Sequence, residues 1–293
     1  MADSLLFKNR KLFSNSFFLY LSHFADYGLG LIILPFIARM LGPIEIGKIG
    51  ISQAYGSFVL LSVQFGFSLY AVREISRIRN SRKKIKIFAS NLFLFNLSFV
   101  PIIAVITFLL LTFLDVYENI QFYIIISMIG SLIQGITPNW YFEGLEKIRL
   151  VAVLKTFFRS TAIILALIFI NDSSGAWIFL TLNAFSSLAQ FFVLFYKMNK
   201  SVGGLDFSNK VSLKKIFYSS SHSFLITIIP TIYQNLSFLI LSITLNPILI
   251  GYYFASLKVY LGFNNLFSPL SQAFLPRISN LESNSPDHAK SHI

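Results

Sequence analysis

The sequence predicts an all-α integral membrane protein with about eight transmembrane helices. Of its residues 55% are hydrophobic and only 12% are charged, whereas a soluble domain carries about 25% charged residues. Phe alone occurs 33 times. So little polar surface cannot cover a water-soluble fold. Apolar runs of ~20 residues, the length that a helix needs to cross a bilayer, recur along the chain.

Eight apolar segments qualify as membrane spans, and short polar loops separate them. The first is too long for a signal-peptide core, and no small-residue cleavage site closes it, so a retained span is predicted. Trp140 and Trp177 fall at span ends, where aromatic side chains prefer the membrane interface. In chain order the predicted spans are 16–38, 46–70, 87–114, 120–142, 151–170, 176–196, 216–244 and 249–275.

The charges of the loops predict the orientation. Nineteen Lys and Arg lie on one side of the predicted spans, and the turns on the other side hold only Arg39 and Lys48. Because cytoplasmic loops of membrane proteins are rich in Lys and Arg, both termini are expected in the cytoplasm. The nineteen are Lys8, Arg10, Lys11, Arg73, Arg77, Arg79, Arg82, Lys83, Lys84, Lys86, Lys147, Arg149, Lys197, Lys200, Lys210, Lys214, Lys215, Arg277 and Lys290.

The Lys and Arg of the predicted cytoplasmic loops account for the net charge of +12. A nucleic-acid partner is therefore not expected. The basic cluster between Arg73 and Lys86 is expected to bind anionic membrane lipids instead.

A short motif recurs at a fixed offset, as LGPIEIG at 41–47 and LNPILIG at 245–251. Six predicted spans lie in that interval, so both copies enter the membrane in the same direction, as in transporters built from parallel repeats. The expected domains are an N-terminal six-helix lobe at 1–200, a cytoplasmic linker at 201–215, the first two helices of an incomplete second lobe at 216–275, and a polar, disordered tail at 276–293.

The first copy of the motif also carries charge between two apolar segments. Gly42, Pro43 and Gly47 are expected to form a tight reversal on the outer side of the membrane. Arg39 and Glu45 flank this reversal, and we expect them to have a structural role at the membrane interface rather than to bind substrate.

Three stretches resemble signatures of bacterial O-antigen flippases of the Wzx type, which belong to the multidrug/oligosaccharidyl-lipid/polysaccharide exporter superfamily. They are IARMLGPIEIGKIG at 37–50, YAVREISRIR at 70–79 and QGITPNWYFEGLEKIR at 134–149. The second contains Arg73 and Glu74. The third is the most specific, because it sets Pro138, Trp140, Gly144 and Glu146 at fixed spacings.

The resemblance extends from the N-terminus to about residue 275. Members of the superfamily typically have twelve or more spans in two lobes around a central cavity, so this chain is expected to be C-terminally shortened. The resemblance implies a transporter rather than an enzyme. Its substrate would be an O-antigen or other polysaccharide repeat unit on undecaprenyl pyrophosphate, moved between the leaflets of the bacterial inner membrane from the cytoplasmic to the periplasmic side.

The resemblance also sets expectations about partners. These are the lipid-linked oligosaccharide, membrane lipids, and the polysaccharide polymerase with its chain-length machinery. No cofactor, no metal ion and no catalytic residues are expected. A flippase for such a substrate needs a polar cavity that is open to lipid and that contains cations for the phosphates.

Charged residues inside spans are candidates for that cavity, because burying them in a bilayer is costly. Lys258 falls about ten residues into the last span, ~15 Å from its outer end. Lys155 and Arg159 are i, i+4 neighbours on the fifth span, one and two turns from the cytoplasm. For Lys258 the alternatives are an ion pair with a packing role or a span with different bounds. For Lys155 and Arg159 the alternative is a side chain that reaches back to the headgroups.

Three further polar residues are candidates near the cytoplasmic side. His23 and Asp26 are three residues apart in the first span and therefore share a helix face, where they could relay a proton. His222 has a position on the seventh span that is comparable with that of Lys155. A satisfied polar pair or a headgroup contact is the alternative for each.

Two other functions remain open on the sequence alone. A cation-coupled drug exporter of the same superfamily would be indicated by an excess of carboxylates in the cavity. A membrane-embedded glycosyl or acyl transferase would need carboxylates or His gathered at one membrane face. The sequence has no P-loop, no HExxH motif and no Cys, so ATP-driven and thiol chemistry are not expected.

Overall fold

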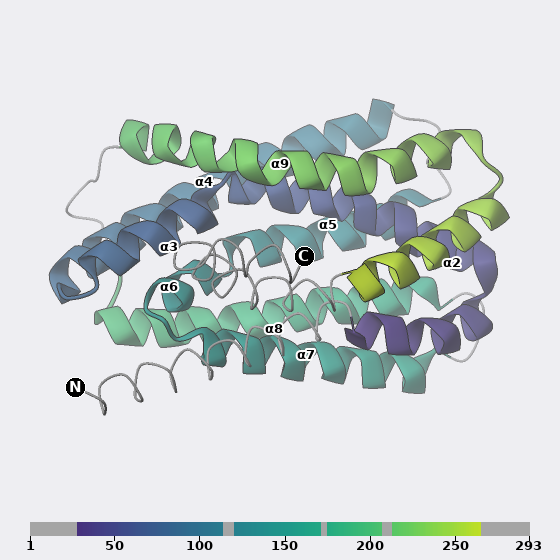
Figure 1. Ribbon diagram of the computed structural model, residues 1–293, viewed down its shortest axis with the longest axis horizontal. Helices are drawn as coiled ribbons and strands as arrows, with labels where there is room; N and C mark the ends of the chain where they lie inside the picture. The colour runs from purple at the N-terminus through teal and green to yellow at the C-terminus, as the bar shows by residue number, and fades with distance from the viewer. Residues whose placement is uncertain (1–27, 114–119, 171–174, 207–212, 265–293) are drawn as a thin grey trace, which may run out of the picture.

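The computed structural model describes residues 28–113, 120–170, 175–206 and 213–264, and these form helices joined by short turns (Figure 1). The all-α prediction is therefore confirmed. The helices are α2 (Leu29–Gln64), α3 (Phe67–Ile78), α4 (Arg82–Phe113), α5 (Gln121–Ile136), α6 (Asn139–Gly144), α7 (Ile148–Phe169), α8 (Ala176–Val202) and α9 (Leu213–Thr244), followed by a helical segment at 247–264.

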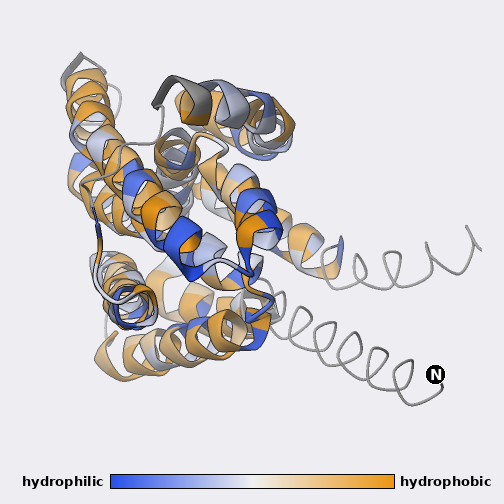
Figure 2. Cartoon of the chain, turned by 90° about the vertical axis from the view of Figure 1, so that its left-hand side faces the viewer, coloured by the Kyte–Doolittle hydropathy of each residue, from blue (hydrophilic) through white to orange (hydrophobic). Residues whose placement is uncertain are grey.

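Six described helices are long and apolar enough to cross a membrane, which makes the chain a multi-pass membrane protein. The helices run side by side in one bundle, in which α5 packs against both α2 and α8, and α7 packs against α8 (Figure 1). Hydrophobic ribbon makes up most of the periphery in Figure 2. Large apolar side chains such as Phe108, Phe157 and Ile168 are exposed there, as lipid contact requires. The total of eight spans and the division into lobes stay predictions.

Helix α2 consists of two pieces that meet at Gly42, where φ is 75° and ψ is 171°. Only glycine adopts this conformation readily, and Pro43 then begins the second piece, a position that suits its fixed φ. The chain folds back here, because Gly30 and Ser57 line one cavity although a straight helix would separate them by ~40 Å. The predicted tight reversal is therefore present.

The two copies of the repeated motif lie against each other at the end of the bundle that holds the Gly42 turn (Figure 1). A Cβ atom added at Gly47 would lie 3.1 Å from the carbonyl oxygen of Pro247, and one added at Gly251 would collide with the carbonyl oxygen of Pro43. Each glycine thus faces the proline carbonyl of the other copy. The pairing places both motifs at one end of the bundle, as a parallel repeat requires.

The second predicted span is too long at its C-terminal end. Helix α2 ends at Gln64 rather than at residue 70, and Phe65 and Gly66 both have positive φ, at 36° and 70°. The backbone of α9 lies against this break and leaves room only for glycine, because a Cβ at Gly66 would lie 2.5 Å from the nitrogen of Phe224. Residues 67–78 instead form α3, a separate helix that packs against α6 and α9.

Two of the signature stretches pack against each other at the opposite end of the bundle. YAVREISRIR lies largely in α3, and QGITPNWYFEGLEKIR contains α6. A Cβ at Gly144 would lie 2.8 Å from Cβ of Ile75, and a guanidinium nitrogen of Arg79 lies 2.7 Å from a carboxylate oxygen of Glu146. Gly144 and Glu146 therefore have structural roles at the α3–α6 contact.

The two tryptophans have different environments. Trp177 is 42% exposed, as a residue at the membrane interface should be, but Trp140 is 2% exposed and packs in the core beside Tyr141. Each lies near the end of a helix that is long and apolar enough to span a membrane, as predicted. Trp140 faces the protein core because it lies in α6, where Tyr141 and the preceding Pro138 are also buried.

Cysteine labelling can test the predicted orientation of the chain in the membrane. Asn80 lies in the turn between α3 and α4, Asn246 lies in the turn after α9, and both are exposed. These two turns lie near opposite ends of the bundle (Figure 1), and the chain has no Cys. In spheroplasts, Asn246→Cys should react with a membrane-impermeant maleimide, whereas Asn80→Cys should react only after permeabilisation. The reverse pattern would contradict the orientation inferred from the basic loops.

The contact at Gly66 predicts an unusually sensitive position. Gly66→Ala should lower the unfolding temperature of the detergent-solubilised protein strongly, because backbone atoms of α9 occupy the place of the new Cβ. Gly204→Ala is the matched control, since Gly204 also has positive φ but nothing lies within 4 Å of its Cβ position. The control should lose only the ~1–2 kcal/mol of left-handed strain. Equal losses in both variants would mean that the α9 contact does not restrict residue 66 to glycine.

Candidate functional site: a polar cleft between the helices

Three adjoining cavities form one cleft inside the bundle, and all three are lined by Gln53 and Ser57 of α2. The polar chamber, of about 260 Å³, lies between α2, α5, α7 and α8. The mixed chamber, of about 380 Å³, lies between both pieces of α2, α7 and the 247–264 segment. A smaller chamber of about 190 Å³ extends toward α9. Together they are called the polar cleft below.

Three cations line the polar cleft. Lys155 and Arg159 of α7 line both the polar and the mixed chamber, and Lys258 lines the mixed and the smaller chamber. Of the 24 Lys and Arg of the chain, these are the three that the sequence places in the interior of predicted spans. The cleft thus brings together cations from segments about a hundred residues apart.

Arg159 lies deeper than the sequence predicted. Helix α7 begins at Ile148 rather than at residue 151, so Arg159 lies eleven residues, or ~16 Å, from its first residue and at the middle of its 22 residues. Lys258 is likewise eleven residues into the helical segment that begins at 247. Its ammonium nitrogen lies 5.0 Å from the centre of the Phe254 ring, a distance at which a ring face attracts a cation.

The electrostatic character of the cleft is positive. None of the described residues that line its three chambers is Asp or Glu. Glu143, which interacts electrostatically with Lys155, lies outside this lining. Because charges attract strongly in surroundings of low dielectric constant, an anion in the cleft would be stabilised far more than in water.

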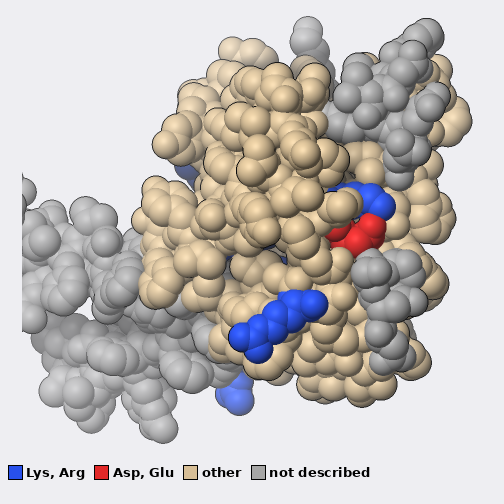
Figure 3. Space-filling view, turned by 90° about the vertical axis from the view of Figure 1, so that its right-hand side faces the viewer, with Lys and Arg blue, Asp and Glu red and all other residues tan. Residues whose placement is uncertain are grey.

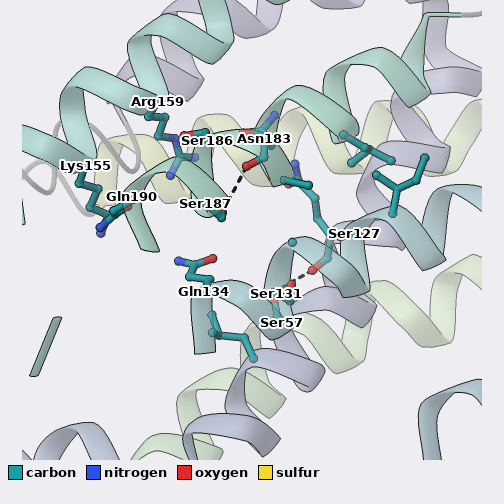
Figure 4. A pocket seen from close by; sticks show the side chains of 16 residues that line it. Ser57, Ser127, Ser131, Gln134, Lys155, Arg159, Asn183, Ser186, Ser187 and Gln190 are labelled. Atoms are coloured by element: carbon teal, nitrogen blue, oxygen red, sulfur yellow. Dashed lines mark hydrogen bonds between the residues drawn. The ribbon is translucent and has the colours of Figure 1, made fainter. Parts of the chain in front are cut away.

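Uncharged polar side chains dominate the polar chamber. Figure 4 shows Ser57, Ser127, Ser131 and Gln134 on one side of it, facing Asn183 and other residues of α8 across the cavity, with Arg159 and Lys155 to one side. The full polar set without charge is Gln53, Ser57, Ser127, Ser131, Gln134, Asn183, Ser186, Ser187 and Gln190.

Hydrogen bonds orient several of these side chains. The amide nitrogen of Asn183 donates to the carbonyl oxygen of Phe179 over 2.7 Å, and the amide nitrogen of Gln190 donates to Oδ1 of Asn139 over 3.2 Å. These bonds orient the side chains through their amide nitrogens and do not use their amide oxygens, which can accept hydrogen bonds.

These uncharged polar residues were not predicted as a site, although their spacing in the sequence indicates one. The polar residues of α8 recur at 183, 186, 187 and 190, and those of α5 recur at 127, 131 and 134. Both spacings place polar side chains on one face of an otherwise apolar helix. A single serine in a membrane span does not indicate a site. Several polar residues at helical spacing do, because they form one polar face.

The mixed chamber differs in chemistry. Beside its cations and amides it is lined largely by branched apolar side chains and two rings. These are Leu31, Ile33, Leu34, Ile37, Ile46, Ile49, Ile163, Leu261, Phe179 and Phe254. The cleft therefore has one polar and one largely apolar chamber, and Lys155 and Arg159 line both.

The other predicted residues lie elsewhere. His222 is exposed on α9 and does not line the described cleft, so it is not brought together with the three cations. His23 and Asp26 lie outside the described residues.

The charged residues of the signature stretches also lie outside the lining. Arg39 is exposed, and Glu45 is buried in an ion pair of 2.5 Å with Lys48. Figure 3, which faces the end of the bundle near the Gly42 turn, shows few charged side chains. Arg73 is exposed at the other end, and Glu74 lies 3.8 Å from Arg77.

Comparison with known proteins identifies the family. Residues 12–282 match the model of a family described as "Polysaccharide biosynthesis protein". A protein of Escherichia coli strain K12 named "Putative O-antigen transporter" is 26% identical over 261 residues, which cover 87% of this chain and 62% of that protein. A Shigella dysenteriae protein of the same name is 27% identical over 277 residues, with 92% and 67% covered.

The chain thus spans 62% and 67% of the lengths of these curated relatives. No solved structure matches it. The match over nearly the whole sequence and the signature stretches agree, and the chain belongs to the polysaccharide biosynthesis protein family, as its resemblance to the Wzx-type O-antigen flippases predicted.

Proposed function

We propose that this chain translocates O-antigen or related polysaccharide repeat units, linked to undecaprenyl pyrophosphate, from the cytoplasmic to the periplasmic leaflet of the bacterial inner membrane. The observation that carries the proposal is the convergence of Lys155, Arg159 and Lys258 on one cleft inside an apolar bundle. Two relatives are named putative O-antigen transporters, which supports a role in O-antigen transport.

The physical problem in such transport is the pyrophosphate, because an ion transferred into hydrocarbon loses its hydration at a cost of many kcal/mol. A cleft whose cations lie near the middle of their helices offers the anion a path in which protein charges replace water. Arg159 suits this role because a guanidinium presents several donors in a planar fork that matches phosphate oxygens. Hydroxyls and amides beside it would form hydrogen bonds with the sugar in place of those that water forms.

The lining also weighs against the alternatives. A drug exporter that binds organic cations would be served by carboxylates, whereas the described lining of the cleft is basic. A transferase would need an acid or base next to the acceptor, and the described lining offers hydroxyls, amides and cations.

Charge removal tests the proposal. In a strain that lacks its own O-antigen flippase, Arg159→Ala and Lys258→Ala should each reduce delivery of O-antigen at least tenfold relative to the wild-type chain. A charge-assisted hydrogen bond contributes about 1.5–3 kcal/mol, and every 1.4 kcal/mol is a factor of ten. Delivery is measured as the amount of polymer-bearing lipopolysaccharide at matched membrane levels of the transporter.

A conservative variant and a control variant complete this experiment. Lys258→Arg should retain part of the activity, because the charge persists with altered geometry. Lys83→Ala is the matched control, since Lys83 is an exposed cation at the start of α4, and it should deliver O-antigen normally. Normal delivery by both Arg159→Ala and Lys258→Ala would contradict the proposal that the cations bind the pyrophosphate.

A further inference from the structure

We infer that the polar chamber is a subsite for the sugar residue next to the pyrophosphate, and that it recognises an uncharged, hydroxyl-rich sugar by hydrogen bonds. This inference rests on the proposed function, which assigns the pyrophosphate to the cations. It goes further in assigning a separate place and a separate chemistry to the glycan.

The first argument is the composition of the chamber. Of the sixteen described residues that line it, nine are Ser, Asn or Gln and none is aromatic. Hydroxyl and amide groups both donate and accept hydrogen bonds, which matches the hydroxyl groups of a sugar, since these also do both. The chamber is therefore suited to hydrogen bonding rather than to stacking on rings.

The second argument is the position of the chamber relative to the cations. Lys155 and Arg159 line the polar chamber and the mixed chamber alike, so a pyrophosphate held by them would have a polar cavity on one side and a largely apolar one on the other. The group bonded directly to the pyrophosphate on the polar side is the first sugar. The two chambers therefore match the two ends of a lipid-linked sugar in only one orientation.

Several polar side chains of the chamber are also held in place before a ligand binds. The polar side chains come from α2, α5 and α8, and those of α8 lie on one helix face within two turns. Asn183 and Gln190 are held by the hydrogen bonds described above. Because a preformed lining loses little side-chain entropy on binding, such a subsite can discriminate between ligands as well as hold them.

Ser186 offers the sharpest test. It lines the polar chamber and neither of the other two. Ser186→Ala removes one hydroxyl, and Ser186→Leu also fills part of the chamber with apolar bulk. The purified full chain in nanodiscs is titrated with farnesyl pyrophosphate, with the same lipid carrying a disaccharide on its pyrophosphate, and with inorganic pyrophosphate.

The readout is the ratio of the affinities for the two lipids. In the wild-type protein the disaccharide should strengthen binding at least fivefold. Ser186→Leu should bring the ratio close to one, and Ser186→Ala should reduce it two- to tenfold, the range expected for one uncharged hydrogen bond. Neither variant should change the affinity for farnesyl pyrophosphate more than about twofold.

Gly30→Leu is the matched control. Gly30 lines the mixed chamber, and nothing lies within 4 Å of its Cβ position, so the new side chain fills cavity space without displacing backbone. The ratio of affinities should be unchanged in this variant, whatever happens to the two absolute values.

Other results would overturn the inference. A ratio near one in the wild-type protein, or a ratio that Ser186→Leu and Ser186→Ala both leave unchanged, excludes a sugar subsite in the polar chamber, while tight binding of farnesyl pyrophosphate would still support the proposed function. A ratio lowered by Gly30→Leu alone would place the sugar in the mixed chamber. Wild-type protein that binds neither lipid more tightly than inorganic pyrophosphate would refute the proposed function, and the subsite with it.

Discussion

The close approach of two backbones at Gly47 and Gly251 determines much of the architecture. In a membrane, helices gain little from burying apolar side chains, because lipid is equally apolar, so small residues that allow close packing become decisive. Here the two copies of the repeated motif meet, each with its glycine against the proline carbonyl of the other. The contact fixes the 247–264 segment beside the fold-back of α2, and this segment carries Lys258 to the cleft.

The cleft in turn depends on how the bundle distributes polarity. Its outer surface presents large apolar side chains, while hydroxyls, amides and cations of α2, α5, α7 and α8 face one another inside. A charged residue at the centre of a membrane helix costs ~3 kcal/mol or more when it faces lipid. The polar cleft, which both Arg159 and Lys258 line, reduces that cost because they do not face lipid there.

The parts of this structure that sequence could predict are those set by local composition. Apolar runs predicted the helices, and charges inside those runs predicted Lys155, Arg159 and Lys258. The break at Phe65 and Gly66 was missed because the backbone that lies against it belongs to α9, some 150 residues away in the chain. The burial of Trp140 was missed for a similar reason, since it follows from the packing of α6 on α3. Neither long-range contact leaves a mark in the local pattern.

The polar chamber shows why charge alone is an incomplete description of the site. Cations attract any pyrophosphate, whatever it carries, so Lys155, Arg159 and Lys258 could supply affinity but little discrimination between one lipid-linked sugar and another. Hydroxyls and amides that line a cavity act differently, because a bound ligand that covers them without forming hydrogen bonds incurs their desolvation cost. If the proposed function holds, a cleft with both kinds of lining would separate the two tasks: the cations would bind the pyrophosphate that all such substrates share, and the hydrogen-bonding groups would distinguish the sugars.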